Sequence, residues 1–268
     1  MLPLAGCKIP LMKIATYNAA SIRARMPLLL EWLAEHEPDV VAVQETKVED
    51  DKFPRGDFED MGYEVAMHGQ KSWNGVCILS RTPISNVRVG FEDELMPTDA
   101  RIISGEVNGI TILNTYVPNG NTVGSEKWAY KMAWLERFAQ LVRERFRPED
   151  PFVWLGDINI ARHPIDVFDS ARVFGGVGHH PDEFERLDAI LDFGLVDLFR
   201  KFHPEPGQFT FWDFVVPNGF KRNIGWRIDC LYAPPSLADL CTDCWIDRDA
   251  RSLERPSDHT FVIGEFDL

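Results

Sequence analysis

Five sets of polar residues border the apolar segments of this sequence, and their side chains offer oxygen and imidazole groups. Three sets come directly after an apolar run and two come at or just before the start of one; they are Asn18, Gln44-Glu45, Asp157 with Asn159, Asp229, and Asp258-His259. Taken singly, each is most simply a solvated turn residue. Glu45 and Asp157, however, follow fully apolar runs, and a charge placed there needs a partner.

The residue types in these sets favour metal-assisted hydrolysis of a phosphodiester. Glu45 and nearby carboxylate or amide oxygens suit a hard octahedral cation such as Mg²⁺ or Mn²⁺. An imidazole with a carboxylate behind it, as His259 would have in Asp229, can stay protonated and neutralise charge on phosphoryl oxygens. Asp157 could orient or deprotonate a water, with Asn159 fixing its rotamer. No covalent nucleophile stands out, so we expect water to attack.

Short apolar runs alternate with helical patterns along the chain. The runs predict strands at Lys13–Tyr17, Val40–Val43, Gly75–Leu79, Ile110–Tyr116, Phe152–Leu155, Ile228–Tyr232 and Phe261–Phe266. Helical spacing predicts helices at Met26–Glu37, Lys127–Phe146 and Phe184–Phe193. This mixture indicates an α/β protein of one domain with helices outside β-sheets. If the later strands run antiparallel to the earlier ones, all five polar sets meet at one edge of the sheets.

The composition excludes several classes of protein. With 268 residues, 45% hydrophobic and 26% charged, the chain has the balance of a globular protein and not of a disordered or fibrous one. Its net charge of −14 argues against a broadly basic nucleic-acid coat protein. It leaves room for an enzyme that holds metal with carboxylates and a polyanion with a few local cations. The start, MLPLAGCKIPLMK, is too short and proline-broken for a signal peptide or membrane span, so we expect a cytoplasmic protein without membrane contact.

The cysteines do not predict a disulfide framework. They are odd in number and scattered, at Cys7, Cys77, Cys230, Cys241 and Cys244, which indicates a reducing compartment. Cys241 and Cys244 form a C-x-x-C, the spacing of half a zinc site or a redox pair. No second pair accompanies them, so we expect ordinary thiols.

Eight segments carry a resemblance to a known family. They are IATYNAASIRAR, PDVVAVQETK, NTYVPNG, WLGDINIA, GLVDLFR, FTFWDF, NIGWRIDCLYA and RPSDH. With these segments, from Lys13 to the C-terminus, the chain resembles the exonuclease III family of abasic-site endonucleases, within the endonuclease/exonuclease/phosphatase superfamily. We expect one such domain over residues 1–268, with residues 1–11 as a short N-terminal extension.

The resemblance implies a fold and an activity. The fold is a four-layer α/β sandwich, two mixed β-sheets face to face with helices outside. The activity is Mg²⁺-dependent cleavage on the 5′ side of abasic sites in duplex DNA, with Mn²⁺ as a substitute for Mg²⁺. Trimming of DNA from 3′ ends (3′–5′ exonuclease) and removal of 3′ blocking groups are common companion activities. The expected partner is double-stranded DNA with abasic sites or blocked 3′ ends, and we expect a monomer.

The resemblance also implies roles for single residues. Glu45 matches the metal ligand and Asn18 its neighbour, while Asp258 closes the metal side. Asp157 matches the aspartate that activates water and is also an implied metal ligand. Asn159 matches its partner in catalysis and metal binding, and Asp229 the support of His259. Contacts to phosphate are implied for Tyr116 and Asn119. The apolar slot for a flipped-out abasic sugar is implied for three residues: Phe211, Trp226 and Ile228.

Cations and aromatics near these motifs are further candidates for DNA contacts. Arg23, Lys47 and Lys71 are predicted to contact the substrate, and Arg25 and Lys221-Arg222 lie in similar places. Trp73 and Trp212 are candidate wedges against the duplex, although each could equally pack its own loop. His179-His180 is read as a solvated pair in a glycine-rich loop.

One position departs from the family pattern. Two residues after Asn18 the family usually carries asparagine or aspartate, whereas this chain has Ala20. We therefore expect weaker metal binding and no firm second metal position. Two other functions stay open: hydrolysis of a phospholipid or phosphoinositide headgroup by the same core, and a non-catalytic DNA-binding relative.

Overall fold

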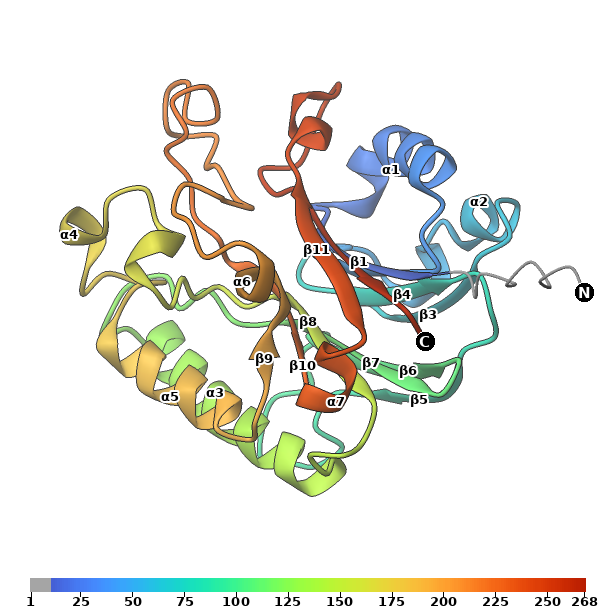
Figure 1. Ribbon diagram of the computed structural model, residues 1–268, viewed down its shortest axis with the longest axis horizontal. Coiled ribbons are helices and arrows are strands. Elements are labelled where there is room, and N and C mark those ends of the chain that lie inside the picture. The colour runs from blue at the N-terminus through green and yellow to red at the C-terminus, as the bar shows by residue number, and fades with distance from the viewer. Residues whose placement is uncertain (1–10) are drawn as a thin grey trace, which may run out of the picture.

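Two six-stranded mixed β-sheets pack face to face (Figure 1) in this computed structural model, which describes residues 11–268. The first sheet has the order β11-β12-β1-β2-β4-β3, with β1 Met12–Asn18, β2 Val40–Gln44, β3 Glu64–His68, β4 Val76–Ser80, β11 Cys241–Asp247 and β12 Phe261–Phe266. The second has the order β5-β6-β7-β8-β10-β9, with β5 Ser85–Val89, β6 Ile102–Val107, β7 Ile110–Tyr116, β8 Phe152–Asp157, β9 Val196–Asp197 and β10 Asp229–Ala233.

Helices cover the outer face of each sheet (Figure 1). The first sheet is covered by α1 (Ile22–His36) and α2 (Arg55–Glu59), the second by α3 (Glu126–Arg145) and α5 (Pro181–Leu191). Three shorter helices lie in the later connections: α4 Ser170–Val173, α6 Leu198–Phe202 and α7 Pro235–Ala238. Buried aliphatic side chains of both inner faces form the core between the sheets. The predicted four-layer sandwich is confirmed.

The strand directions bring the polar sets to one edge, as expected. β1 runs parallel to β2, and β7 runs parallel to β8, so the residues that end these strands lie side by side. β12 runs antiparallel to β1, and β10 runs antiparallel to β8, so the residues that begin these two strands lie at the same edge. The register places Asp157 between Tyr116 on one neighbouring strand and Asp229 on the other.

Gly156 allows β7 and β8 to approach closely beside the site. Its φ is +136°, and a Cβ atom there would lie 2.0 Å from the carbonyl oxygen of Thr115 on β7. Only glycine fits such a position without moving one of the strands. The close approach of the two strands therefore requires glycine at position 156, directly before Asp157.

The elements differ from the predictions in several places. α1 begins at Ile22 and not Met26. The N–H of Ile22 donates a hydrogen bond to the carbonyl oxygen of Thr46 (3.2 Å), and the turn after β1 leads directly into the helix. α5 begins at Pro181 and not Phe184, because His180 and Glu183 form a capping box. Five strands were not predicted: β3, β5, β6, β9 and β11. β5 is exposed along its whole length and therefore lacks a buried pattern.

In residues 11–268 no helix has the length and apolar character needed to cross a membrane.

Candidate active site

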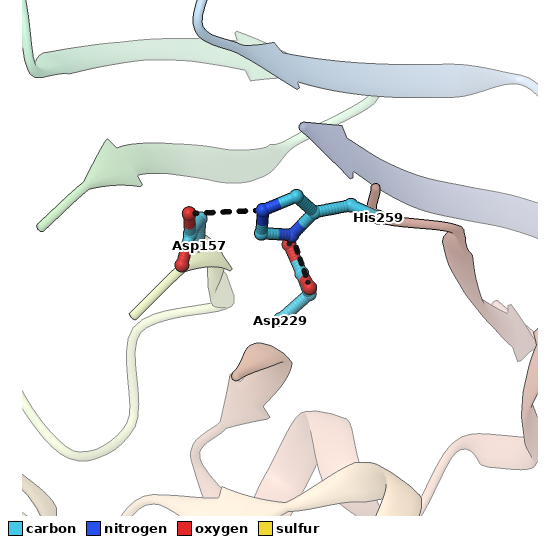
Figure 2. Close-up of side chains that lie close together, drawn as sticks. All are labelled: Asp157, Asp229 and His259. Carbon is cyan, nitrogen blue, oxygen red and sulfur yellow. Dashed lines mark hydrogen bonds and ion pairs between the residues drawn. The ribbon is translucent and has the colours of Figure 1, made fainter. Parts of the chain in front are cut away.

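His259 lies between two aspartates at the edge where the strand ends meet (Figure 2). Its Nδ1 is 2.9 Å from Asp229 Oδ2, and its Nε2 is 3.8 Å from Asp157 Oδ2. All three side chains are buried. Asp157 and Asp229 are paired residues of the antiparallel strands β8 and β10, so sheet pairing itself creates this arrangement.

The two carboxylates set the protonation state of His259. Burial alone would lower the pKa of the imidazole, but the negative charges of Asp229 and Asp157 raise it to about 10. His259 is therefore an imidazolium at neutral pH. It donates from Nδ1 to Asp229 and presents Nε2–H toward the cavity.

Asp157 is a buried carboxylate held by two donors. Asn18 Nδ2 donates to its Oδ2 (2.8 Å), and the backbone N–H of Asn159 donates to its Oδ1 (2.9 Å). The pKa of Asp157 is raised to about 7, because burial and the negative charges of Asp229 and Glu45 outweigh the lowering by the His259 imidazolium. A carboxylate with such a pKa can take a proton from water near neutral pH.

Glu45 follows β2 in a left-handed backbone conformation, with φ +52°. This conformation is uncommon for glutamate and is typical of residues held in place at functional sites. Its carboxylate accepts from Asn18 Nδ2 (3.0 Å) and pairs with Lys47 Nζ (2.7 Å). Burial would raise the pKa of Glu45, but these bonds from Lys47 and Asn18 lower it below its usual value. Glu45 is therefore ionised and faces the same cavity as Asp157.

The donor set fits a hard divalent cation. Asp157, Asp229 and His259 offer ligand atoms within 4.8 Å of one another and could hold a metal ion. A protonated His259 has no free lone pair, however, and Asp229 is occupied by it. Among the predicted metal ligands, Glu45, Asp157 and Asp258 also line the cavity, and carboxylate oxygens are the ligands that Mg²⁺ and Mn²⁺ prefer.

Two predicted metal ligands have their amide oxygens engaged elsewhere. The oxygen of Asn18 accepts from the N–H of Ala20 (2.9 Å), and its nitrogen faces Asp157 and Glu45. The oxygen of Asn159 accepts from Asn119 Nδ2 (3.1 Å). In this arrangement both residues orient the site, and their roles as ligands stay predictions.

Tyr116 and Asn119, the two predicted phosphate contacts, line the same cavity as Asp157 and His259. Burial and the charges of Glu45 and Asp157 raise the pKa of Tyr116 well above its usual value, so the phenol keeps its proton and can donate it. Arg101 was not indicated by the sequence. Its guanidinium lies 4.8 Å from the Tyr116 ring centroid and donates to the Tyr116 carbonyl (3.1 Å). The available signal was its place directly before β6, a strand that the sequence analysis missed.

Phe211, Trp226 and Ile228 form an apolar wall of the same cavity, which has a volume of about 740 Å³. Phe211 makes isolated backbone bridges to both Trp226 and His259, so the wall adjoins His259. Ile228 is buried, whereas Phe211 and Trp226 are partly exposed to the cavity. The three residues predicted for a sugar slot are thus brought together beside the charged cluster.

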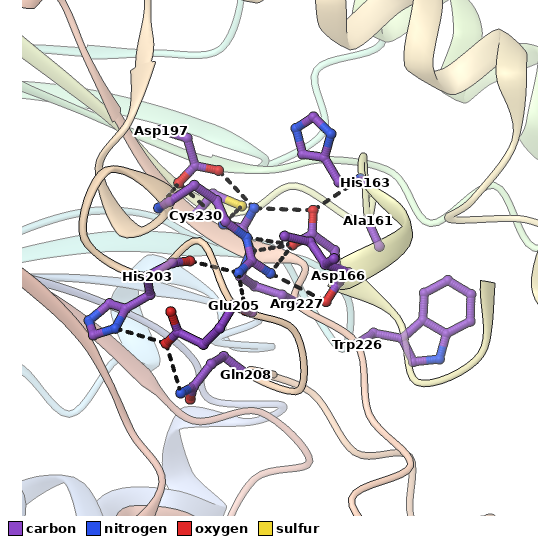
Figure 3. A network of polar contacts seen from close by, with 12 residues as sticks. Ala161, His163, Asp166, Asp197, His203, Glu205, Gln208, Trp226, Arg227 and Cys230 are labelled. Carbon is purple, nitrogen blue, oxygen red and sulfur yellow. Dashed lines mark hydrogen bonds and ion pairs between the residues drawn. The ribbon is translucent and has the colours of Figure 1, made fainter.

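A buried ion network fixes the backbone of this wall (Figure 3). Arg227, between Trp226 and Ile228, points away from the cavity and pairs with Asp166 (2.8 Å) and Asp197 (2.7 Å). Burial would raise the pKa of Asp166, but Arg227 and Arg200 lower it to about 2. Because removing one member of a buried ion pair is costly, Arg227 holds its two neighbours in place. In the sequence, Arg227 stands out only as part of the segment NIGWRIDCLYA.

The predicted cationic contacts fall into two groups. Lys47 is engaged with Glu45, and exposed Arg23 donates to the carbonyl of Lys52 (2.7 Å). Lys71 and Lys221 are exposed, and Arg222 borders the cavity. Arg25 is partly buried. Their predicted contacts with DNA stay predictions.

The structure decides between the two alternatives for Trp212 in favour of packing in its own loop, and it shows that the solvated interpretation of His179 was wrong. Trp212 is 1% exposed and cannot act as a wedge, because its Nε1 donates to Asn223 (3.2 Å) and Phe220 packs against its ring. His179 is also 1% exposed and not solvated, because its two ring nitrogens bond Ala161 (2.6 Å) and Ser170 (2.8 Å). Trp73 is 70% exposed and remains a candidate wedge.

The described cysteines are free and buried, including both residues of the C-x-x-C. Burial raises the pKa of the Cys241 thiol to about 11 and that of Cys244 well above its usual value. These are the properties of ordinary core thiols. Cys7 lies outside the described residues.

Comparison with known proteins places the whole architecture among DNA-processing enzymes. Residues 15–259 match the Endonuclease/Exonuclease/phosphatase family. The chain is 32% identical to "Exodeoxyribonuclease III" of Haemophilus influenzae, with 95% of this chain and 100% of that protein covered. It is 40% identical to an AP endonuclease structure from Archaeoglobus fulgidus, with a TM-score of 0.93 and coverage of 96% and 100%. A 3′ phosphatase from Neisseria, bound to a product DNA hairpin, is 34% identical with a TM-score of 0.92 and the same coverage.

Proposed function

The chain belongs to the endonuclease/exonuclease/phosphatase family, and from this premise we propose that it hydrolyses the phosphodiester on the 5′ side of abasic sites in duplex DNA. It is a DNA-repair nuclease with 3′–5′ exonuclease and 3′-phosphatase activity. One observation carries the abasic-site proposal: a single cavity brings together the buried imidazolium of His259, the carboxylate of Asp157 and an apolar wall. Neither charged groups alone nor an apolar wall alone would support it.

The residues have complementary roles in hydrolysis. Asp157, oriented by Asn18 and the Asn159 backbone, accepts a proton from the attacking water. His259, held as imidazolium by Asp229, donates Nε2–H to a phosphoryl oxygen as negative charge builds in the transition state. The protonated phenol of Tyr116 supplies another donor to the phosphate.

We propose Mg²⁺ as the cation, with Mn²⁺ as a substitute. The carboxylates of Glu45, Asp258 and Asp157 would hold the ion, because carboxylate oxygens are hard donors. When bound there, the ion supplies positive charge that stabilises the phosphoryl oxygens and the leaving group. Ala20 offers no side-chain oxygen, and Lys47 competes for Glu45, so we expect weak binding of the metal.

The apolar wall supports an abasic sugar as the selected group. A sugar without a base presents no hydrogen-bonding edge, and flipping it out of the helix breaks no base pair, so its cost is low. Phe211, Trp226 and Ile228 offer apolar surface directly beside His259. A lipid headgroup would have no use for such a wall, so the observations favour DNA.

The test uses a labelled duplex with one central abasic site, a duplex with a recessed 3′ end, and a duplex with a 3′ phosphate. Each is incubated with the protein in Mg²⁺ and in chelator. We expect a single Mg²⁺-dependent nick 5′ to the lesion, which leaves a 3′ hydroxyl. Trimming or phosphate release without that nick would overturn the abasic-site proposal and leave a nuclease of 3′ ends. Headgroup release from phosphoinositide vesicles, with no action on any duplex, would overturn the choice of DNA.

A further inference from the structure

Lys131, in α3, is a fully buried lysine behind the active site. Its Nζ donates to the carbonyl oxygens of Asn119 (3.2 Å) and Asn159 (2.9 Å) and pairs with Glu183 Oε1 of α5 (2.5 Å). The side chains of Lys131 and Glu183 are both 0% exposed. The three protons of the ammonium group thus have three acceptors, two of them in loops that form the site.

Glu183 extends this connection to a third loop. Its carboxylate accepts from the backbone N–H groups of Gly178 (3.0 Å) and His180 (3.1 Å). Gly178 lies against the apolar wall, since a Cβ there would be 3.2 Å from a ring carbon of Trp226. One ion pair therefore connects the Asn119 loop, the Asp157–Asn159 loop and the loop beside the abasic-sugar wall.

These connections act directly on the groups that do the chemistry. The N–H of Asn159 holds Asp157, and its side chain bonds Asn119. A change in the position of the Asn159 backbone therefore moves the carboxylate that activates water. Displacements of about 1 Å in reacting groups can lower rates about 10²-fold.

We propose that Lys131, paired with Glu183, is a positioning residue for the hydrolysis, holding the Asn119 and Asn159 loops in register around Asp157. The inference rests on the proposed function of the same site. A purely structural ion pair would affect the free energy of unfolding and leave the turnover of folded enzyme unchanged. The two roles are separable by experiment.

The main variant is Lys131→Met/Glu183→Gln. It removes both charges, so neither is left buried without a partner, and the glutamine can still accept from Gly178. Lys131→Met alone removes the same donors, and Lys131→Arg keeps the charge and donors. The matched control is Arg137→Met on the same helix, where Arg137 pairs with Asp93 and Glu144 away from the cavity.

The measurements are kcat and KM for abasic-site nicking in Mg²⁺, taken below the unfolding temperature of each variant. For Lys131→Met and for the double variant we expect kcat to fall about 10- to 100-fold, by misplacement of Asp157, with little change in KM. We expect the same proportional fall for 3′-phosphate release, since both reactions use Asp157. Lys131→Arg should recover part of kcat, and Arg137→Met should lower the unfolding temperature without changing kcat.

Two outcomes would overturn the inference: a folded double variant with wild-type kcat, or a loss of kcat that Arg137→Met matches at equal loss of stability. Should Lys131→Met not fold, the double variant decides alone. The wild-type protein separates this failure from a failure of the proposed function. Absence of nicking by wild type contradicts the function, whereas normal nicking by wild type and double variant alike contradicts only the role of Lys131.

Discussion

Asp157 and His259 divide the acid–base work because their surroundings shift their pKa values in different ways. Burial raises the pKa of Asp157 toward neutrality, so its carboxylate is a usable base. Two carboxylates raise the pKa of His259, so the imidazole stays a cation while Asp157 loses its proton. Pairs of titratable groups with separated pKa values are a common basis for assigning acid and base in one site.

The coupling between these residues predicts the pH dependence of the His259→Gln variant. Activity needs the ionised form of Asp157, so kcat/KM rises with pH through the pKa of that group. The imidazolium lowers this pKa, and its removal should move the acid limb to higher pH. We also expect the maximal rate to fall about 10²- to 10³-fold, through loss of a charged donor. Nicking rates between pH 5 and 10 at fixed, saturating Mg²⁺ test this, and an unmoved acid limb would refute the coupling.

At this scale the sequence indicated which residues take part but not how they are oriented. Asn18, Glu45, Asp157 and His259 follow from residue type and position at strand ends. The direction of the Asn18 amide depends on the turn at Ala20, whose N–H takes the oxygen. The pairing of Lys47 with Glu45 depends on the left-handed backbone conformation of both residues, which flank Thr46. Local sequence patterns do not determine such backbone choices.

At the scale of elements, the pairing of β7 with β8 sets the position of Tyr116 relative to Asp157. Gly156→Ala tests this dependence. A methyl group 2.0 Å from the Thr115 oxygen must displace a strand, so we expect a loss of about 3 kcal/mol or more in stability and a large loss of activity. The measurement is urea unfolding together with nicking.

Gly109→Ala is the matched control. Gly109 also has positive φ (+82°), but nothing lies within 4 Å of the position a Cβ would take. Only the backbone strain remains, and we expect a loss of about 1–2 kcal/mol with activity retained. Equal effects of the two substitutions would show that strand approach is unimportant.

We expect the segment Phe211–Ile228 to determine substrate choice, and Trp226→Ala tests its role. Removal of the indole opens the sugar wall without touching Asp157 or His259. We expect abasic-site nicking to fall about 10-fold or more, since an aromatic ring that the bound sugar covers contributes about 1–2 kcal/mol of contact, while 3′ trimming falls less. Rates on the two duplexes under identical conditions provide the ratio. An equal fall in both would mean that Trp226 is only a packing residue.

Two of the five strands that were not predicted lack a buried pattern, whereas β6 is buried along most of its length and was missed all the same. β5 is exposed along its whole length and β9 has two residues, so neither offers an alternating buried pattern. Trp212 looked like its exposed counterpart Trp73 in sequence, because only tertiary contacts with Phe220 and Asn223 bury it. The seven strands that were predicted and the long helix α3 lie within a few residues of their expected bounds, because hydrophobic periodicity reports burial directly.

For the whole molecule, the net charge of −14 limits how DNA can be bound. Several predicted cations are already engaged within the protein, so few phosphates should be neutralised. If Lys71 contacts one phosphate, Lys71→Gln should reduce the slope of log Kd against log salt by about one. Arg88→Gln, an exposed change on the edge strand β5, should leave the slope unchanged. Equal slopes for wild type and Lys71→Gln would exclude the contact.

Monomeric state and cytoplasmic location remain predictions from the sequence.

The central claim is that Asp157 acts in the transition state of phosphodiester hydrolysis, and single-turnover cleavage by Asp157→Asn tests it most directly. Asparagine keeps the size and the place of the side chain but cannot accept the proton from water. With an abasic-site duplex in Mg²⁺, we predict a rate about 10²- to 10⁴-fold below wild type and a Kd close to that of wild type. An unchanged rate, or a loss of binding as large as the loss of rate, would contradict the account.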